Sequence, residues 1–518
     1  MSMSIPAAAR PEAHPFEPVP TGRPRGRLVV VSDRLPIALT REPGQSWRVS
    51  PVRGALISAL QPVLRDRKGV WIGSPDVTEE EAGGLRKVLT GAIHEGGFAL
   101  RPVLLKAQER REGYSGFAGE VIWPLFHDLS LECNFSASYW QTFRKLNRKF
   151  ARAVVRSLAR GGAGTDLVWV NDPLLMNVGA ELKKLGVPCR TAFFLHLPFP
   201  SPDLYLKLPW REDLLAGLLA FQRVGFQTER DLANFLACVR LLAPGAALAE
   251  LGGGRWLLRG SLRGAAFEVL AGACPIGVDF RQIAERAARP EVNARAEALR
   301  ASLRGRRILL GIDRVDRAHG IPEKLRAYAE ALTRYPDLKE KVSLVQVALP
   351  SREGLPRHAA LRSEIERLVG EINGFFGRPG WVPVEYLHRD LGPEEILAWQ
   401  RAADVALVTP LKSGMHLSAK ELCAADLEER KALVLSEFAG AAPQLGCGAL
   451  RVNPFDCQGV ARTLRQALTM KERERRGRMR KMREEVRQHD VFWWANAFLG
   501  AALQGKTEEQ PALTTGIR

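Results

Sequence analysis

Short runs of apolar, mostly β-branched residues recur along the 518-residue chain, separated by longer stretches in which apolar positions have helical spacing. Each run is hydrophobic on both faces, which is typical of a strand buried in a parallel sheet. Strands that alternate with helices form βαβ units, so the pattern predicts an α/β fold with mostly parallel sheets. The strand-like runs are residues 28–31, 70–73, 167–170, 191–195, 308–312, 342–347, 384–387, 405–408 and 432–435.

The strand–helix pattern occurs twice, and the break falls near the Pro-Ile-Gly of residues 275–277. Residues 139–158 and 174–185 are examples of the helical stretches in the first half. We therefore predict two doubly wound, Rossmann-like domains, residues 27–273 and 274–485. Their strand ends face each other across a cleft.

The two ends of the chain fall outside these domains. Residues 1–26 are rich in Pro, Ala and Arg and have no apolar core of a signal peptide, which predicts a disordered N-terminal arm. Residues 486–503 are aromatic and predict a C-terminal helix that crosses back to the N-terminal domain. A helix that only covers the second domain is the alternative. Residues 504–518 are predicted to form a flexible tail.

Charge narrows the classes of partner. The formal net charge is +18, which favours anionic partners such as nucleic acid, a membrane surface or phosphorylated small molecules. The densest basic run, residues 471–481, also carries glutamates and fits a solvated helix, since no nucleic-acid-binding motif accompanies it. No apolar run reaches the roughly 18 residues of a membrane span. We therefore expect neither nucleic acid nor a membrane as a partner.

Cysteine usage indicates a compartment. The seven cysteines are scattered and form no Cys-x-x-Cys pair, which favours reduced thiols and a cytoplasmic protein.

Polar residues follow several of the predicted strands in the first half of the chain. Arg34 follows the first run, and Asp172 and His196 follow two later ones. Because the carboxyl ends of parallel strands border the predicted cleft, these side chains are candidates for a ligand site. Gly54 and Ala55 open an apolar helix, where the backbone lets a phosphate approach closely. For the histidine taken singly, a structural role is the more frequent alternative.

Residues 114–127 combine aromatic side chains with glycines. Tyr114 and Trp123 in this segment are suited to stacking on a sugar ring beside glycine-rich turns. The alternative is that they are core aromatics of a loop.

The second half contains a further set of residues after strands. Arg314 and His319 follow one predicted strand and Arg352 follows the next. Guanidinium groups form paired hydrogen bonds to phosphate oxygens. A glycine turn after residues 405–408 begins a helix and suits a diphosphate, and a glutamate within that helix suits a ribose diol. The candidates there are Ser413, Gly414, Met415, His416, Leu417 and Glu421.

Several longer motifs, in this order, resemble the trehalose-6-phosphate synthases, which are retaining glycosyltransferases of family 20 with the two-domain GT-B architecture. The likeness extends over residues 28–499. Glucosylglycerol-phosphate synthases are similar too, mainly at residues 208–212 and 490–496. The motifs are Trp-Pro-x-Phe-His at 123–127, Phe-Phe-Leu-His-x-Pro-Phe-Pro at 193–200, Gly-Phe-Gln-Thr-Glu at 225–229, Val-Thr-Pro-Leu at 408–411 and Leu-Ser-x-Phe-Ala-Gly-Ala-Ala at 435–442.

The resemblance implies an acceptor site in the first half. Arg34, together with Arg352 from the second half, would hold the acceptor phosphate. Tyr114, Trp123 and Asp172 would contact the acceptor sugar.

The resemblance also implies a donor site. His196, Arg314 and His319 would be catalytic, and Arg314 and His319 would contact the donor as well. Neither a metal nor another cofactor is implied. Transfer would occur at the front face with retention, and cations and backbone dipoles would stabilise the leaving diphosphate. The further donor-binding residues would be Gly54, Ala55, Ser413, Gly414, Met415, His416, Leu417 and Glu421.

The chain departs from the family pattern in the donor half. His319 stands where the resemblance implies a lysine, Ser413 where it implies an aspartate, and His416 where it implies an asparagine. Where the pattern has paired glycines, this chain has Gly54 and Ala55. Loss of one electrostatic contact to a leaving group commonly lowers the rate on the order of 10²–10³-fold.

The predicted reaction moves glucose from a nucleotide-glucose, with UDP-glucose favoured, to glucose 6-phosphate, which gives trehalose 6-phosphate. One alternative is glucosylglycerol-phosphate synthesis from ADP-glucose and glycerol 3-phosphate. Another is a catalytically impaired homologue that binds a sugar phosphate. The expected partners are a nucleotide-sugar donor and a sugar-phosphate acceptor, and a homo-oligomer is left open.

Overall fold

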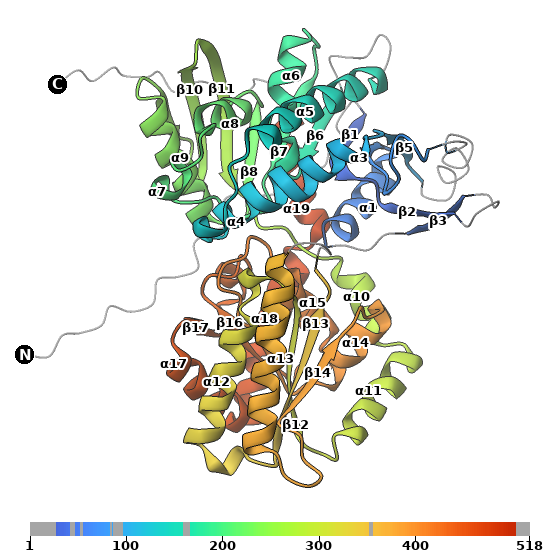
Figure 1. Ribbon diagram of the computed structural model, residues 1–518, viewed down its shortest axis with the longest axis vertical. Coiled ribbons are helices and arrows are strands. Elements are labelled where there is room, and N and C mark those ends of the chain that lie inside the picture. Colours follow the sequence, from blue (N-terminus) through green and yellow to red (C-terminus); the bar gives the residue numbers. More distant parts are fainter. Residues whose placement is uncertain are drawn as a thin grey trace, which may run out of the picture.

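The computed structural model describes residues 27–41, 47–51, 55–82, 85, 97–158, 166–351 and 356–503. The predicted N-terminal arm and C-terminal tail lie outside these residues. The chain forms two α/β units, the first in the upper half of Figure 1 and the second in the lower half. No helix among the described residues is both long and apolar enough to cross a membrane.

The first unit is built on a sheet that has nine strands within the described residues, in the order β5-β4-β1-β6-β7-β8-β11-β10-β9. Pairing is parallel from β5 through β11, and β10 pairs antiparallel with both of its neighbours. A small antiparallel hairpin, β2 (Ile37–Thr40) and β3 (Arg48–Pro51), stands beside it. The sheet strands are β1 Leu28–Arg34, β4 Val70–Ser74, β5 Ala99–Pro102, β6 Leu167–Asn171, β7 Arg190–Phe194, β8 Arg223–Phe226, β9 Ala247–Glu250, β10 Arg255–Leu262 and β11 Ala265–Ala273.

The second unit is built on a sheet whose described strands are all parallel, in the order β14-β13-β12-β15-β16-β17. The runs predicted as strands from their hydrophobicity are confirmed in both units. The strands are β12 Arg307–Arg314, β13 Val342–Leu349, β14 Val384–His388, β15 Val405–Val408, β16 Ala432–Ser436 and β17 Leu450–Val452.

Helices cover both faces of each sheet, and the alternation of side chains along β1 shows why. Val29 and Val31 belong to the core that includes Phe143 of α5, whereas Val30 belongs to the core that includes Leu60 of α1. In the first unit the helices are α1 Ala55–Arg67, α3 Ala107–Arg110, α4 Trp123–Phe126, α5 Ala137–Ser157, α6 Val178–Lys184, α7 Pro202–Tyr205, α8 Arg211–Leu218 and α9 Glu229–Leu242.

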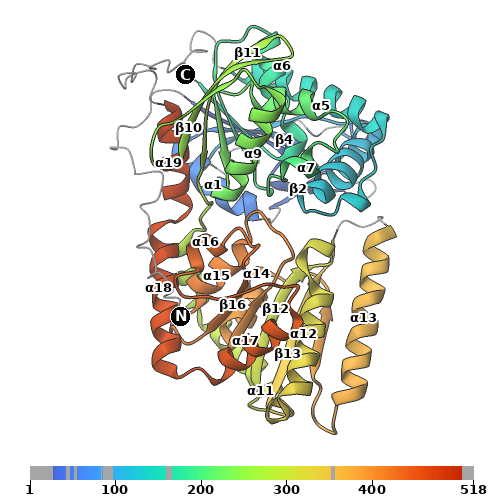
Figure 2. The same ribbon diagram turned by 90° about the vertical axis from the view of Figure 1, so that its left-hand side faces the viewer.

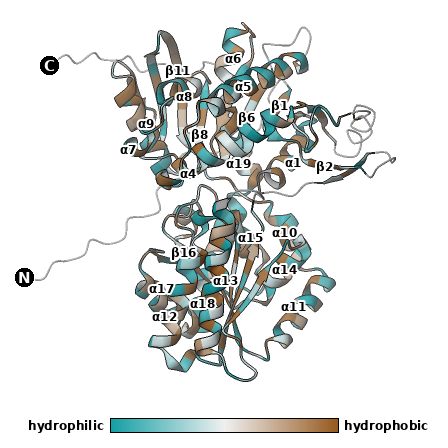
Figure 3. Cartoon of the chain, viewed as in Figure 1, coloured by the Kyte–Doolittle hydropathy of each residue, from teal (hydrophilic) through white to brown (hydrophobic). Residues whose placement is uncertain are grey.

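The helices of the second unit are amphipathic where they face water, and Figure 3 shows the mixed hydrophilic and hydrophobic residues along α11 and α17. The run 471–481, predicted as a solvated helix, lies almost wholly within α18. The helices are α10 Phe280–Ala287, α11 Pro290–Ser302, α12 Ile321–Arg334, α13 Pro356–Phe376, α14 Pro393–Ala402, α15 Leu417–Ala425, α16 Ala442–Leu445, α17 Cys457–Thr469, α18 Glu472–Gln488 and α19 Val491–Leu503.

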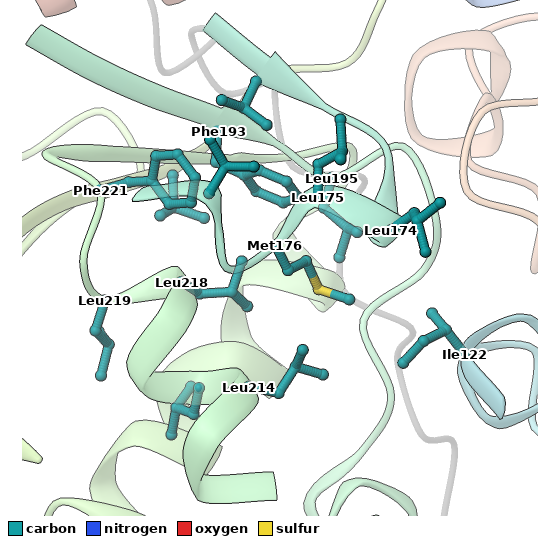
Figure 4. Packing of buried hydrophobic residues seen from close by; sticks show 14 of the residues in the cluster. Ile122, Leu174, Leu175, Met176, Phe193, Leu195, Leu214, Leu218, Leu219 and Phe221 are labelled. Carbon is teal, nitrogen blue, oxygen red and sulfur yellow. The ribbon is translucent and has the colours of Figure 1, made fainter. Parts of the chain in front are cut away.

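The core of the first unit holds the strand ends in place. Figure 4 shows Phe193 and Leu195 of the β7 region packed near Leu175, with Leu214 and Leu218 of α8 close by. All five are fully buried. Because β7 is fixed by this packing, the residues that follow Leu195 leave the sheet at a defined place.

The segment that contains Tyr114 differs from its prediction as a set of glycine-rich turns. Residues Arg111–Ile122 form a π-helix that leads directly into α4. The glycines serve close packing against α5 rather than turns. A Cβ on Gly116 would lie 2.6 Å from the Tyr139 ring, and a Cβ on Gly113 would meet Leu146.

The chain crosses between the two units twice, at neighbouring places. Residues 274–279 lead from β11 to α10, and residues 489–490 join α18 to α19. The Val491 N–H donates to the Val278 carbonyl at 3.1 Å. The helix α19 then packs on the first sheet, with the Trp494 ring 4.9 Å from that of Trp169. Figure 2 shows α18 and α19 following one side of the molecule from the second unit to the first.

Candidate functional site

The carboxyl ends of both sheets meet where the two units touch. Lys412, after β15, forms an ion pair at 2.7 Å with Asp128, which follows α4. Arg357 of α13 donates to the Gly119 carbonyl at 2.6 Å. The backbone of Gly414 lies against the carbonyl of His196, so close that a Cβ on Gly414 would collide with it. These contacts bring strand-end residues of both sheets into one region.

Three acceptor candidates of the first unit gather at the end of β1. The Arg34 guanidinium lies over the Tyr114 ring, 5.5 Å from its centroid. The Tyr114 hydroxyl donates to the Asp33 carbonyl, and the Asp33 N–H donates to Asp172 at 3.0 Å. Arg34 also lies 3.5 Å from Asp76. The structure therefore brings together Arg34, Tyr114 and Asp172, of which strand-end placement predicted Arg34 and Asp172.

The ionisation of Tyr114 in this cluster depends on its burial and on the charged groups beside it. Burial raises the pKa of Tyr114 well above its ordinary value, and Asp33 adds to this, while Arg34 works against it. The Tyr114 hydroxyl is therefore neutral near pH 7. Beside it, the Arg34 guanidinium is partly exposed.

Trp123 lies at a different place, in a cavity of about 230 Å³ between the two units. Its ring stacks on His127 at 4.0 Å. Burial lowers the pKa of His127 to about 4, so this imidazole is neutral near pH 7. Asp316 and His358 of the second unit also line the cavity.

His196 is held by its own neighbours. One ring nitrogen bonds to the side-chain oxygen of Asn171 at 3.0 Å, and the Gln227 amide lies 3.1 Å from the other. Burial lowers its pKa to about 3, which leaves the ring neutral. Both ring nitrogens thus have protein partners. The carbonyl of His196, against Gly414, is the part that faces the second unit.

The turn after β15 shapes the donor candidates of the second unit. The N–H of Gly440 donates to the Ser413 carbonyl at 2.8 Å, which fixes the turn. His416 has a φ of 54°, a left-handed conformation that is uncommon outside glycine, and directly precedes α15. Met415 packs against the core at the join of the two units. The helix start of α15 therefore faces the same region as Gly414.

Beside this turn lies a buried charged pair at the end of β12. Lys324 forms an ion pair with Asp313, and Gln346 donates to the same carboxylate oxygen at 2.9 Å. Burial would raise the pKa of Asp313, but Lys324 and His319 together hold it below its ordinary value. Asp313 is therefore ionised, and its other oxygen lies 3.8 Å from the His319 ring nitrogen Nδ1.

A second cavity, of about 360 Å³, adjoins the ends of β12 and β13. Arg314, Leu417 and Glu421 line it, as does Arg286 of α10. Burial raises the pKa of Glu421, and Arg286 partly offsets the rise. The cavity combines apolar walls with two guanidinium groups and several carboxyl groups, which is the make-up of a small-molecule site.

Two predicted site residues, Gly54 and Arg352, lie outside the described residues. Ala55 begins α1. Sequence reasoning missed Asp313, Lys324 and Arg286. Asp313 closes a buried strand, which was an available signal. Lys324 and Arg286 lie on helices, and only packing places them at the strand ends.

A family profile described as Glycosyltransferase family 20 matches residues 26–504. The chain belongs to glycosyltransferase family 20. A trehalose-6-phosphate synthase of Mycolicibacterium paratuberculosis, strain ATCC BAA-968 / K-10, is 40% identical over 477 residues, which are 92% of this chain and 94% of that protein.

Solved structures of similar proteins have the same fold. An alpha,alpha-trehalose-phosphate synthase (UDP-forming) from Burkholderia xenovorans in complex with glucose-6-phosphate aligns with a TM-score of 0.81 and 31% identity, over 93% of this chain and 100% of that one. A trehalose-6-phosphate protein from E. coli bound with UDP-2-fluoro glucose aligns with a TM-score of 0.81 and 31% identity, over 93% and 99%. This family 20 member thus has the GT-B fold.

Proposed function

We propose that the protein is a retaining glycosyltransferase that moves glucose from a nucleotide-glucose, with UDP-glucose favoured, to glucose 6-phosphate and forms trehalose 6-phosphate. The observation that carries the proposal is the contact of the Gly414 turn with the His196 carbonyl. This contact sets the end of β7, near which we propose acceptor binding, against the turn before α15, near which we propose donor binding. The Burkholderia relative in complex with glucose-6-phosphate supports the choice of acceptor.

The nucleoside of the donor would occupy the 360 Å³ cavity of the second unit. Glu421 offers a carboxyl group to the ribose hydroxyls, at a buried position where its pKa is raised. Arg314 would pair with the diphosphate, since a guanidinium fits two phosphate oxygens at once. The N-terminus of α15 adds its helix dipole.

The acceptor would lie against the end of the first sheet. Arg34 presents a cation for its phosphate, and the neutral Tyr114 hydroxyl and the Asp172 carboxylate border the same place. We propose that Trp123 forms the wall between acceptor and second unit, since it lines the cavity shared by both. Arg352 is proposed as a second phosphate contact from its sequence position.

In the reaction, the bond between the sugar C1 and the diphosphate oxygen breaks while an acceptor hydroxyl oxygen bonds to C1 on the same face. The acceptor proton passes to the leaving diphosphate. Arg314 and the backbone N–H groups at the start of α15 would stabilise the charge that develops on that leaving group. His196, neutral and bonded on both ring nitrogens, would position the sugar through its backbone carbonyl rather than transfer a proton.

A product assay tests this function. The purified protein is incubated with UDP-, ADP- or GDP-glucose, each combined with glucose 6-phosphate or glycerol 3-phosphate, and released nucleotide and product mass are measured. We expect release with a nucleotide-glucose and glucose 6-phosphate, and a product with the mass of trehalose 6-phosphate. The Gly414→Ala variant, purified in the same way, controls for contaminating activity.

The other outcomes decide among the alternatives. Release only with glycerol 3-phosphate would establish glucosylglycerol-phosphate synthesis instead. No release with any pair, together with thermal stabilisation by glucose 6-phosphate, would show a sugar-phosphate-binding homologue. All seven cysteines are free thiols, which supports the further proposal that the protein works in the reducing cytoplasm.

A further inference from the structure

Asp313, His319 and His416 converge at the inner end of the donor region. They come from the end of β12, from the turn before α12 and from the residue before α15. One ligand atom from each residue lies within 4.8 Å of those from the other two. The rings of His319 and His416 are 5.6 Å apart.

Each of these three side chains has a buried oxygen or nitrogen atom that makes no hydrogen bond to the described residues. Asp313 Oδ1, His319 Nδ1 and His416 Nδ1 are each shielded from solvent and accept or donate no hydrogen bond within the described residues. Leaving one buried polar atom without a partner costs about 1–3 kcal/mol. His416 as a whole is only 8% exposed and Asp313 only 2%. Three such groups, converging from separate elements, indicate a bound ligand that satisfies them together.

The chemistry of these three atoms indicates which ion would bind to them. Two imidazole nitrogens and one carboxylate oxygen suit first-row transition ions such as Zn²⁺, whereas Mg²⁺ prefers oxygen ligands alone. Ligand atoms about 2.1 Å from a tetrahedral Zn²⁺ lie roughly 3.4 Å apart. The 3.8 Å between Asp313 Oδ1 and His319 Nδ1 is near that spacing, and small side-chain rotations would bring in His416.

Lys324 limits how strongly a cation binds here. Its ammonium pairs with the other oxygen of Asp313, so the carboxylate charge is already balanced. A cation at the three donor atoms would therefore gain from a further anion. Arg314 and Leu417, the chain neighbours of Asp313 and His416, line the cavity assigned above to the nucleoside. The diphosphate of a donor in that cavity would lie next to the three side chains.

We propose that Asp313, His319 and His416 bind a divalent transition-metal ion of the Zn²⁺ class, whose remaining ligands are diphosphate oxygens of the sugar-nucleotide donor. The first part of this proposal, metal binding, depends only on the three side chains. The second part, contact with the donor diphosphate, rests on the proposed function. The ion would supply positive charge beside the leaving diphosphate.

Direct metal binding tests the first part without any turnover. The full chain carries Cys447→Ser, because Cys447 is an exposed thiol that would bind Zn²⁺ by itself. It is freed of metal with a chelator and titrated with Zn²⁺ by calorimetry, and with Co²⁺ for its visible spectrum. We expect about one ion per chain, with a Co²⁺ spectrum of nitrogen and oxygen ligands and no thiolate band.

Substitutions of the proposed ligands test whether these residues bind the ion. His319→Gln and His416→Ala should each weaken Zn²⁺ binding by at least about tenfold, since loss of even a supporting group costs that much. His388→Gln, which changes a histidine at the end of β14, should leave it unchanged. Zn²⁺ should raise the thermal midpoint of the parent and of His388→Gln, but not that of His319→Gln. Circular dichroism confirms that each variant is folded.

Two results would overturn the metal site: no Zn²⁺ bound by the parent, or equal binding by the parent and the His319→Gln and His416→Ala variants. The second part is tested by repeating the Zn²⁺ titration with UDP, which should tighten binding in the parent and in His388→Gln. An unchanged affinity would refute the diphosphate contact. If Zn²⁺ binds as expected but no glucosyl transfer is found, the proposed function fails and the metal site stands.

Discussion

Asp172 lies just beyond the carboxyl end of β6 with a φ of 72°, and its carboxylate accepts a hydrogen bond from the Asp33 N–H. Asparagine has nearly the same size and shape as aspartate and can still accept this hydrogen bond through its side-chain oxygen. The substitution Asp172→Asn therefore removes the charge without disturbing the chain path, and it isolates the contribution of this carboxylate to acceptor binding.

We predict that Asp172→Asn lowers kcat/KM for glucose 6-phosphate by about 10–100-fold, the range expected for losing a hydrogen bond to a charged group. KM for the nucleotide-glucose should change little. Steady-state kinetics with each substrate varied in turn measures both values. Asp203→Asn, at an exposed position on α7, is the matched control. An equal effect of both substitutions would argue against a role of Asp172 at the acceptor.

Two buried histidines predict how stability depends on pH. Burial lowers the pKa of His127 to about 4 and that of His196 to about 3, whereas an unfolded histidine titrates near 6.5. Below about pH 6.5 the unfolded state therefore binds protons that the folded state does not. The folded state consequently becomes less stable as the pH is lowered.

We expect each histidine to lower the free energy of unfolding by about 1 kcal/mol between pH 7 and pH 5.5. Urea unfolding at a series of pH values measures this slope. In a His127→Gln variant the slope should be smaller, because glutamine does not titrate. A variant slope equal to that of the parent would show that His127 does not contribute.

At the scale of the element, the turn between β15 and α15 depends on one glycine. A Cβ built on Gly414 would collide with the His196 carbonyl oxygen and lie 2.9 Å from backbone atoms of Leu197, so a side chain would push the two units apart. A displacement of about 1 Å at the reacting groups lowers rates on the order of 10²-fold.

We predict that Gly414→Ala lowers kcat/KM by at least about a hundredfold while the protein still folds. Gly477→Ala is the control: Gly477 lies within α18 with open space around it, so alanine should stabilise that helix by about 0.5–1 kcal/mol and leave the rate unchanged. Kinetics and thermal unfolding of both variants give the comparison. Full activity of Gly414→Ala would show that close contact there is unnecessary.

At the scale of the whole molecule, α19 ties the end of the chain to the first unit after the second is complete. Trp494 on this helix is fully buried against Trp169 and Phe194, with ring centroids 4.9 and 5.1 Å away. The two crossings, at residues 274–279 and 489–490, lie side by side and form a double connection between the units.

We predict that Trp494→Ala destabilises the protein by about 3–5 kcal/mol, as expected when a large aromatic side chain is removed from a core. Phe492→Ala, on the same helix but with 37% of the residue exposed, should cost much less. Chemical unfolding curves of the two variants provide the measurement. Similar losses for both would show that the packing of α19 on the first sheet contributes little.

The sequence by itself determined the strands, their grouping into two α/β units and the polar residues at strand ends. Buried strands need apolar residues on both faces, and that requirement is local, so residues 28–31 and 308–312 could be recognised without a structure. Long motifs likewise determined the family. Placement at strand ends also put Arg34 and Asp172 in one region, where the tertiary structure adds Tyr114.

Only the tertiary structure decided which distant residues share a point in space. In the π-helix of Arg111–Ile122, Gly113 and Gly116 let α5 pack closely, and no local sequence pattern indicates that contact. Asp313, His319 and His416 converge because β12 and β15 are neighbours in the sheet, although β13 and β14 lie between them in sequence. Convergence of this kind depends on sheet order and packing, which the hydrophobic pattern of single segments does not specify.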